Sequence, residues 1–513
     1  MTRRIPAIWS GETAILFLLA GLTLALHLVF GGRYGFFRDE LYYLACGRHL
    51  AWGYVDQPPL IAVVARLSGL LLGRSLFAVR FFPALAGAAV VFLTGLLARE
   101  LGGGKWAQGL AALAVLAAPA YLAFDTFLSM NAFEPLFWMI CLWLALRVVK
   151  GGDERLWLVF GLVAGVGLLN KNSLLVFGYA LFVGLLASPA RRVFYSRWIW
   201  LGALVALAIF LPNLLWQWRH GWPQIHVVLN GQLYKNVPVS PGDSLYQQFL
   251  FMQPVTFPIW LAGLWYFFGM REGREFRFLG LTYLTLVAVF LLLKTKAYYL
   301  VPIYPLLLSA GAVAWERWMA KRNWGALRVA LPALVAIGGL VSLPYGVPVL
   351  PVEDFVRYQR LLPMAESVQV ERDATSALPQ LYADMFGWQN LTETVARVYD
   401  RIPSGQRSGC AVLAWNYGEA AAIDYYGPAK GLPRAISGHN NYYLWGPGPY
   451  TGGCVIAVGV PLALLDQLFG QVGIAARVEN RYSMPVENNL AIYICREPRA
   501  PLARMWPKLR YYI

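Results

Sequence analysis

Two adjacent carboxylates, Asp39 and Glu40, stand in residues 36–43, which read FFRDELYY. The segment directly follows an apolar stretch long enough to cross a membrane, so both acids lie at the mouth of that stretch. A carboxylate in such surroundings can act as a general base, because the apolar environment adjusts its pKa. The alternative interpretation is a helix N-terminus whose acids complement the helix dipole. The residues alone favour neither interpretation.

A second polar segment, residues 53–60, reads GYVDQPPL. Asp56 supplies a further carboxylate, while Pro58 and Pro59 break any helix and fix a rigid turn. The alternative interpretation is that this turn is only the exit of a loop.

A third group begins at Asp125, which is the one charged residue of residues 124–132, and Asn131 and Glu134 follow closely. Charged residues beside the membrane core are costly and tend to be functional. A structural aspartate with satisfied hydrogen bonds explains Asp125 as well as a catalytic aspartate does.

The fourth group is cationic. Lys171 lies in residues 170–172, NKN, between two apolar runs with almost no loop, and residues 294–299, KTKAYY, form another tight turn with Lys296 and Tyr298. A lysine at such a depth invites an anionic partner, such as phosphate. The alternative is that the side chain snorkels to the membrane surface.

The composition places these groups in a membrane protein. Of the 513 residues, 58% are hydrophobic and 14% are charged, whereas about 25% charged residues are usual in soluble domains. Apolar runs dominate residues 11–346, and the rest reads like a soluble domain. The net charge of +16 comes from Lys and Arg gathered in short loops, which fits membrane topology better than nucleic-acid binding.

About eleven transmembrane helices are expected, since each span needs roughly 17–25 apolar residues. The predicted spans are 11–30, 79–98, 107–123, 133–149, 156–170, 173–189, 198–216, 254–269, 278–294, 298–315 and 327–345. The start of the chain, with Arg3 and Arg4, is interpreted as the cytoplasmic end of a retained signal anchor. Each predicted inside loop then carries at least two Lys or Arg, in agreement with the positive-inside rule. These loops are 99–106, 150–155, 190–197, 270–277 and 316–326.

An odd number of spans places the C-terminal domain outside the cytoplasm. The predicted domains are a transmembrane catalytic region, 1–346, whose first outer loop is 31–78, and a soluble domain, 347–513. In the soluble domain, strand patterns at 410–415, 454–460 and 490–495 alternate with helical patterns at 378–399 and 418–426. This alternation predicts a small α/β sheet domain.

The soluble domain holds Cys410, Cys454 and Cys495, and the membrane region holds Cys46 and Cys141. An odd count does not resemble a disulfide scaffold. One bridge is compatible with an extracytoplasmic domain, and buried free thiols are equally compatible with the sequence. The pairing stays open.

With this topology, all four polar groups fall on the outer face of the membrane. Carboxylates and ammonium groups that converge on one leaflet describe a pocket for a membrane-bound phosphate. The residues expected to line it are Tyr42, Tyr43, Asp56, Pro58, Pro59, Asn131 and Glu134.

These residues resemble the protein O-mannosyltransferase-like family, glycosyltransferase family 39, within the GT-C class of lipid-linked sugar transferases. The resemblance covers about residues 30–310 in scattered blocks and is most specific in the first outer loop. The matching blocks are 38–43 (RDELYY), Gly53 with 56–60 (DQPPL), Asp125 with Asn131 and Glu134, the Lys171 turn, and 296–299 (KAYY) with Pro302 and Pro305. Segments 417–420 (YGEA) and 437–440 (SGHN) resemble the C-terminal domain of bacterial members.

The resemblance implies an inverting transfer of a sugar from a polyprenyl-phosphate donor, such as undecaprenyl phosphate. The acceptor would be an envelope lipid, a glycan or a protein on the outer face of a bacterial inner membrane. By this resemblance, Asp39 is the general base on the acceptor hydroxyl, Glu40 shapes the acceptor site and Asp125 is the second active-site acid. The groups implied to face the donor phosphate, where a fixed ammonium helps as the leaving group gains charge, are Lys171, Lys296 and Tyr298.

One departure concerns the donor site. Aminoarabinose transferases of this family carry Glu-Lys-Pro where this chain has Gln57, Pro58 and Pro59, so the lysine implied to hold donor phosphate is missing. This argues against aminoarabinose transfer to lipid A and leaves the sugar open. Arg80 is a basic residue that could substitute.

No cofactor is expected. Carboxylates of Asp39, Glu40 and Asp125 would suit Mg²⁺ or Mn²⁺, but no motif supports a metal, and members of this family generally do not need one. The few histidines are scattered, so no zinc motif is present.

Two other classes of function compete with a glycosyltransferase. A lipid-linked-sugar transporter or flippase predicts repeat-related halves with broken helices near the midplane, and the sequence shows no such repeat. A membrane-anchored scaffold leaves the Asp39–Glu40 segment unexplained. Substitution of Asp39 separates the classes, because a scaffold should tolerate it and a transferase should not.

Overall fold

The computed structural model of the chain describes residues 13–362 and 376–513. The expected cytoplasmic start with Arg3 and Arg4, and the first two residues of span 11–30, lie outside the described residues. The chain divides into two compact units, each assembled from separate segments. The first unit is Met1–Arg33, Arg80–Pro212 and Pro238–Phe355, and the second is Tyr34–Val79, Asn213–Val237 and Val356–Ile513.

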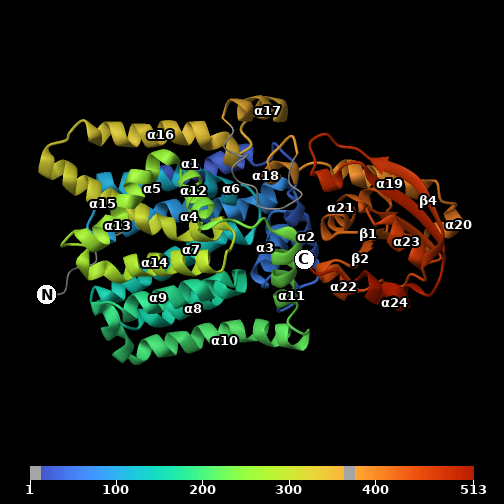
Figure 1. Cartoon of the computed structure of the whole chain (residues 1–513), viewed down its shortest axis with the longest axis horizontal. Coiled ribbons are helices and arrows are strands. Elements are labelled where there is room, and N and C mark those ends of the chain that lie inside the picture. Colours follow the sequence, from blue (N-terminus) through green and yellow to red (C-terminus); the bar gives the residue numbers. More distant parts are fainter. Residues whose placement is uncertain (1–12, 363–375) are drawn as a thin grey trace. The chain divides into compact units, whose positions relative to one another are not determined.

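The first unit is helical throughout its described length. Its helices are α1 (Ala14–Phe30), α4 (Leu76–Glu100), α5 (Lys105–Leu116), α6 (Pro119–Asp125), α7 (Met130–Val149), α8 (Leu156–Asn170), α9 (Ser173–Leu186), η1 (Pro189–Tyr195), α10 (Arg197–Arg219), α12 (Pro241–Phe251), η3 (Pro254–Thr256), α13 (Phe257–Gly269), η4 (Arg274–Phe276), α14 (Arg277–Leu292), η5 (Ala297–Ile303), α15 (Tyr304–Arg322), α16 (Leu327–Gly346) and α17 (Val352–Leu361). The helices α4, α10 and α17 each continue into residues of the second unit. Figure 1 shows α7, α8, α9 and α14 lying side by side along much of their length.

Six of these helices are long and apolar enough to cross a membrane within the described residues. Two bent pairs raise the number to eight if each pair is one span, namely α5 with α6, bent by 64°, and α9 with η1, bent by 109°. The helices α1 and α8, and α3 (Leu60–Leu71) of the second unit, are apolar but shorter. The chain is therefore a polytopic membrane protein, while the count of eleven spans stays a prediction. The bends have a plain cause, since Pro119 and Pro189 each start a new helix after a break.

Glycines allow the helices of this unit to pack backbone against backbone. A Cβ added at Gly263 of α13 would lie 2.0 Å from the Leu307 carbonyl oxygen of α15, and one at Gly311 of α15 would lie 1.8 Å from the Ile259 carbonyl oxygen of α13. Small residues that permit such close approach are typical of helix interfaces in membranes. The α13–α15 pair is thus a close backbone-to-backbone contact at the centre of the unit.

The second unit combines helices with one five-stranded sheet. Its elements are α2 (Arg38–Arg48), α3 (Leu60–Leu71), α11 (Pro223–Asn230), η2 (Gly231–Lys235), α18 (Gln380–Ala383), α19 (Trp388–Asp400), α20 (Ser404–Arg407), β1 (Cys410–Ala414), α21 (Tyr417–Tyr426), η7 (Pro428–Lys430), β2 (Ala435–Ser437), α22 (Asn440–Trp445), β3 (Cys454–Val458), α23 (Leu462–Leu468), β4 (Phe469–Val478), η8 (Pro485–Glu487), β5 (Leu490–Pro498), α24 (Leu502–Met505) and η9 (Trp506–Leu509). The strand order is β2-β1-β3-β5-β4. β1 pairs in parallel with β2 and β3, whereas β5 pairs antiparallel with β3 and β4.

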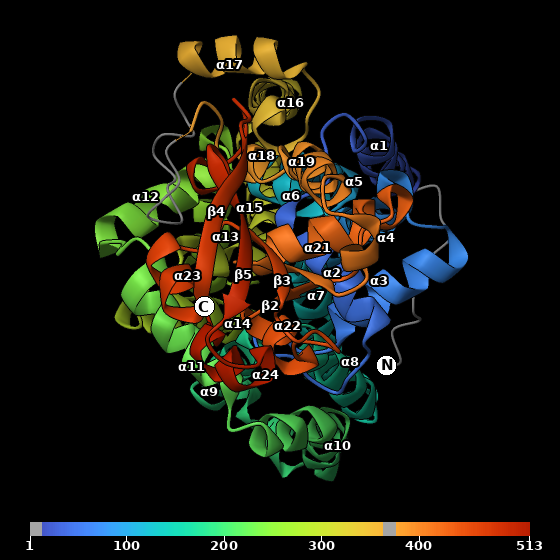
Figure 2. The same ribbon diagram turned by 90° about the vertical axis from the view of Figure 1, so that its right-hand side faces the viewer.

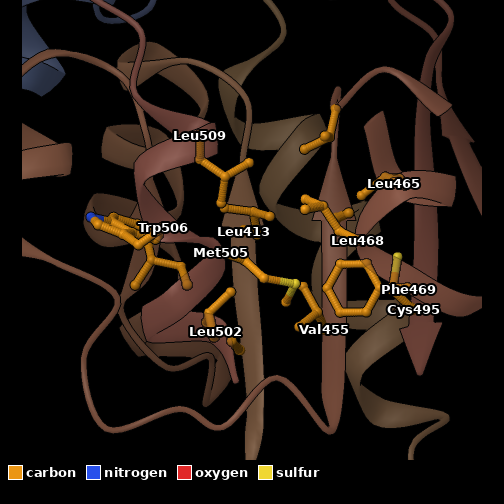
Figure 3. Close-up of a cluster of buried hydrophobic side chains, with 14 residues drawn as sticks. Leu413, Val455, Leu465, Leu468, Phe469, Cys495, Leu502, Met505, Trp506 and Leu509 are labelled. Atoms are coloured by element: carbon orange, nitrogen blue, oxygen red, sulfur yellow. The ribbon is translucent and has the colours of Figure 1, made fainter. Parts of the chain in front are cut away.

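Helices cover both faces of this sheet (Figure 2). On one face, Leu413 and Val455 of the strands pack with Leu465, Met505 and other apolar side chains of α23, α24 and η9 (Figure 3). The opposite face packs against α19 and α21. The central strands β1 and β3 are buried at every residue, which explains their continuous apolar sequences. The C-terminal part of the chain therefore contains the small sheet that the sequence predicts.

The strands predicted at 410–415, 454–460 and 490–495 correspond to β1, β3 and β5, while β2 and β4 were not predicted. β2 has only three residues, and β4 carries Gly470 and Gly473 and is largely exposed, so neither shows a clear strand pattern. A disulfide joins Cys410 and Cys454, which face each other in the parallel β1–β3 register. Cys495 is a buried free thiol.

Candidate active site

The helix α2 presents Asp39 from its first turn. Phe37 precedes the helix in an extended conformation, and its N–H donates to Glu40 Oε2 at 2.8 Å. Glu40 is fully buried by this contact, whereas the Asp39 side chain keeps 28% of its surface exposed. The two adjacent acids thus have different surroundings, because Glu40 caps the helix and Asp39 reaches solvent.

The Asp39 carboxylate is held on one oxygen. The hydroxyl of Tyr417 donates to Asp39 Oδ1 at 2.8 Å, and Arg38 Nε lies 3.7 Å from the same atom. Arg38 also approaches Asp384, with Nη1 3.6 Å from Oδ1, and its guanidinium lies 5.7 Å from the centre of the Tyr417 ring. The hydroxyl and the guanidinium both face Oδ1 and fix the orientation of the carboxylate.

Tyr417 is positioned by the start of another helix, α21. The Asn416 side chain accepts the Glu419 N–H at 3.0 Å, and Glu419 Oε2 accepts the Asn416 N–H at 3.2 Å, which is a reciprocal capping box. A Cβ added at Gly418 would lie 2.6 Å from Cγ of Arg38. Only glycine at this position lets α21 approach α2 closely enough for the hydroxyl of Tyr417 to reach Asp39.

A second carboxylate, Asp56, lies close to Asp39. The Tyr42 hydroxyl donates to Asp56 Oδ1 at 2.9 Å, and Asn440 Nδ2 donates to Oδ2 at 3.1 Å. Burial raises the pKa of Asp56 to about 6, and the negative charge of Asp39 contributes to the rise. Asp56 therefore protonates more readily than an exposed aspartate does, and the two neighbouring carboxylates have unlike surroundings.

Aromatic side chains enclose these carboxylates. Tyr42 and Tyr43 are buried, and the Tyr42 ring lies 4.5 Å from that of Tyr417, measured between ring centres. Pro58 and Pro59 are also buried, at the start of α3. These side chains hold both acids in place. The name carboxylate cluster is used below for Asp39, Asp56, Tyr42, Tyr417 and Asn440.

A separate polar cluster lies in the first unit, around Lys171. Lys171 Nζ donates to Glu134 Oε2 at 2.6 Å and to Asn131 Oδ1 at 2.8 Å. It also lies 4.5 Å from the centre of the Tyr299 ring and 5.5 Å from that of Tyr298. A break between α8 and α9 places the lysine there, because Lys171 is extended and ends α8. The ammonium is therefore already compensated by a buried carboxylate, whose other oxygen accepts the Ser173 hydroxyl.

Asp125 ends α6 and is 5% exposed. It faces α4 at Gly87, where an added Cβ would lie 2.0 Å from Asp125 Oδ2. The neighbouring Thr126 hydroxyl donates to the Gly346 carbonyl at 2.7 Å, which ties this turn to the end of α16. The carboxylate thus sits in a niche that only glycine at position 87 leaves open.

The remaining predicted residues of the first unit take varied positions. Arg80 is buried, and its Nη1 donates to the Gly31 carbonyl. Lys296 precedes η5 and is partly exposed. Tyr298 packs edge to face against Tyr299, with ring centres 4.9 Å apart. Of these three, Tyr298 is the one placed beside Lys171.

The structure therefore joins Asp39, Asp56 and Tyr42 in one cluster, and Lys171, Glu134 and Asn131 in another. Two partners of the carboxylates, Tyr417 and Asn440, were not predicted as site residues. The signal was present, since both belong to the YGEA and SGHN segments that resemble the C-terminal domain of bacterial GT-C members. In the described ranges, no group of three His, Cys, Asp or Glu side chains is arranged to hold a metal ion.

Comparison with known proteins agrees with the resemblance seen in the sequence. A family model described as dolichyl-phosphate-mannose-protein mannosyltransferase matches residues 56–216. No curated protein sequence matches the chain.

Two solved structures share the fold. ArnT from Cupriavidus metallidurans, bound to undecaprenyl phosphate, superposes with a TM-score of 0.61 at 17% identity and covers 94% of this chain and 98% of its own. The oligosaccharyltransferase AglB from Archaeoglobus fulgidus, in complex with an inhibitory peptide and a dolichol-phosphate, gives a TM-score of 0.51 at 13% identity, covering 87% of this chain and 69% of its own. The chain therefore has the fold of GT-C membrane glycosyltransferases.

Proposed function

We propose that this protein is a GT-C glycosyltransferase that moves a sugar from a polyprenyl-phosphate donor, such as undecaprenyl phosphate, to an acceptor hydroxyl. The observation that carries the proposal is the carboxylate of Asp39, which is partly exposed and oriented by Tyr417 and Arg38. A general base needs such access to the proton that it removes. The matching family model and the shared fold support the same reaction class.

In the proposed reaction, Asp39 removes the proton of the acceptor hydroxyl as its oxygen attacks the anomeric carbon of the sugar. The bond from that carbon to the phosphate oxygen breaks, and the polyprenyl phosphate leaves with the bonding electrons. Attack opposite the leaving group inverts the anomeric centre. Negative charge grows on the phosphate, so cationic and hydroxyl groups that face it lower the barrier.

The geometry refines the roles that the resemblance implies for the acids. Glu40 is buried in the cap of α2, so we assign it to holding Asp39 in place instead of contacting the acceptor. Asp56 is the better second acid of the acceptor side, because it lies in the carboxylate cluster. Asp125 remains a proposed active-site acid.

The proposed donor-phosphate residues remain Lys171, Lys296, Tyr298 and Arg80. The ion pair of Lys171 with Glu134 limits how strongly Lys171 can attract the donor phosphate. An incoming phosphate must compete with Glu134 for the ammonium or share it, so most of its attraction must come from other cations.

We further propose that residues 347–513 form an extracytoplasmic domain, that residues 1–346 form a catalytic membrane region, and that the enzyme acts on the outer face of a bacterial inner membrane. The Cys410–Cys454 disulfide supports an oxidising location. The charge pattern of the loops supports the same orientation.

Sugar transfer by the purified protein in detergent tests the proposal. A panel of polyprenyl-phosphate sugars would be combined with envelope lipids, glycans and peptides as acceptors. Asp39→Asn keeps the shape and removes the base, and Asp466→Asn on α23 serves as an exposed control. Transfer by the wild type and the control, but not by Asp39→Asn, is expected. Donor translocation across vesicles without transfer would instead favour a flippase.

A further inference from the structure

Arginines line a cleft between α2 and α3, away from the Asp39 end of α2. Arg48 lies in the last turn of α2, Arg66 on α3, and Arg74 just beyond α3, and together they border a cleft of about 370 Å³, including the part open to solvent. Gly47 lets the two helices approach each other closely where they border the cleft. A Cβ there would lie 3.1 Å from the Ala62 carbonyl oxygen and from the Arg66 nitrogen, so the two helices touch through their backbones.

The charges of this cleft are poorly compensated. Burial lowers the pKa of Arg48, the positive charges of Arg74 and Arg434 lower it further, and Asp424 opposes the shift. Arg48 donates to the Asp424 main-chain carbonyl at 3.2 Å. In the described parts of the chain, none of the four arginines forms an ion pair with a carboxylate.

The carboxylate of Asp424, which acts on Arg48, is turned to other partners. Asp424 Oδ1 accepts the Ala435 N–H at 2.9 Å, and its Oδ2 accepts the Tyr442 hydroxyl at 2.9 Å. The pKa of His49 is lowered by burial and by Arg434 and Arg48, so this ring adds no compensating interaction. Three guanidinium groups therefore border the cleft, and the carboxylate of Asp424 is engaged by other partners.

An exposed apolar surface adjoins the cleft. Val63, Leu67, Leu70 and Leu71 follow one face of α3 at helical spacing, and Leu70 and Leu71 are 65% and 68% exposed. The opposite face of α3, with Ile61, Ala62, Ala65 and Ser68, is the buried one. Two aromatic residues near α3 in the sequence are also exposed, namely Trp52 before the helix and Phe77 after it. An apolar helix face beside basic side chains and aromatic residues is typical of a segment that lies in a lipid headgroup region.

We propose that this arginine cleft binds the phosphate of an anionic phospholipid, whose acyl chains cover the exposed face of α3. Guanidinium groups recognise phosphate oxygens in pairs of hydrogen bonds, which suits a cleft bordered by three of them. The site is distinct from the carboxylate cluster and does not depend on the proposed sugar transfer.

Lipid titration followed by native mass spectrometry tests the site. The full-length protein would be delipidated in detergent and titrated with dioctanoyl phosphatidylglycerol, with dioctanoyl phosphatidylcholine as the zwitterionic comparison. The double variant Arg66→Gln with Arg74→Gln removes two exposed charges, and Arg504→Gln on α24 is the matched exposed control. We expect the double variant to bind phosphatidylglycerol about 30-fold more weakly, at about 1 kcal/mol per arginine, and Arg504→Gln to bind as the wild type does.

Further variants separate the sources of the phosphate. Leu70→Ser should weaken phosphatidylglycerol binding, because the acyl chains lose apolar surface, and Asp39→Asn should leave binding unchanged while abolishing transfer. Equal binding by the double variant and the wild type would overturn the proposal. So would inorganic phosphate that competes as strongly as the phospholipid, or farnesyl phosphate that displaces it at lower concentration, since these outcomes would assign the cleft to a free anion or to the donor.

Discussion

Asp39 and Lys171 are both charged groups set in largely apolar surroundings, but the two units treat them differently. Asp39 keeps an exposed side and is approached by a hydroxyl and a guanidinium on one oxygen. Lys171 is closed in by a carboxylate, an amide oxygen and two aromatic rings. A group that must exchange a proton with substrate needs the first arrangement, whereas the second stabilises a fixed charge. Asp39 is therefore a better candidate for chemistry than Lys171 is.

The largest expected effect concerns Asp39, the partly exposed group. Asp39→Asn should lower the rate of sugar transfer about 10²- to 10⁴-fold, the usual contribution of a general base. The folded state should be little changed, because the amide can still accept the Tyr417 hydrogen bond. Transfer kinetics measured with saturating donor check the rate, and a thermal unfolding curve checks the fold. A variant with nearly wild-type turnover would remove Asp39 as the base and direct attention to Asp56.

The next largest effect concerns Lys171, the enclosed group. Lys171→Met leaves Glu134 as an uncompensated buried charge and should destabilise the protein by about 3 kcal/mol. Glu134→Gln should cost less, since Lys171 keeps Asn131 and the tyrosine rings. Thermal unfolding in detergent measures both variants.

The double variant Lys171→Met with Glu134→Gln sharpens this test. It removes both charges and should recover stability relative to Lys171→Met. If transfer recovers with stability, the lysine is structural. If the protein is stable but its affinity for the donor stays low, Lys171 also binds the phosphate.

The two regions also differ in how far the sequence predicted them. The helices of the first unit were predictable because uninterrupted apolar runs have few alternatives in a membrane; the number of spans was not settled in this way. The partners of Asp39 were not, because Tyr417 is far away in the chain and only the capping boxes and the close approach at Gly418 bring it to α2. The ion pair of Lys171 with Glu134 was missed for a similar reason, since α7 and the α8–α9 break meet only in the folded unit.

The residue Asp56 offers a pH-dependent test of the carboxylate cluster. Its pKa is raised from 3.8 to about 6 by burial, so the folded protein binds this proton more tightly than the unfolded chain does. Asp56 therefore favours the folded state as pH falls from about 6 towards about 4, and this advantage is lost as pH rises through about 6. Asp56→Asn should raise stability at pH 8 relative to pH 4.5 by about 1–3 kcal/mol.

Unfolding curves at both pH values measure this change. Glu419 and Glu487 also have raised pKa values because they are buried. Glu487→Gln is therefore the control, and the difference caused by Asp56→Asn should persist in that background. A pH profile unchanged by Asp56→Asn would mean that the Tyr42 and Asn440 hydrogen bonds outweigh burial.

The smallest effect concerns Tyr417, the hydroxyl that orients the base. Tyr417→Phe removes one hydrogen bond to Asp39 and keeps the ring that packs on Tyr42 and Arg38. Transfer should fall about tenfold, equivalent to about 1.4 kcal/mol. The loss should appear in kcat per folded enzyme and leave the KM for the donor unchanged, because the base is no longer oriented by the hydroxyl.

The split between kcat and KM separates orientation from folding. A merely structural tyrosine would lower only the amount of active enzyme, and Tyr399→Phe, which also removes a hydroxyl that donates a hydrogen bond, is the matched control. If Tyr417→Phe lowers kcat per folded enzyme and Tyr399→Phe does not, the Asp39 carboxylate is oriented from the sheet-bearing segment of its own unit. If neither variant lowers it, Arg38 alone is sufficient to orient Asp39, and the hydroxyl contributes only packing.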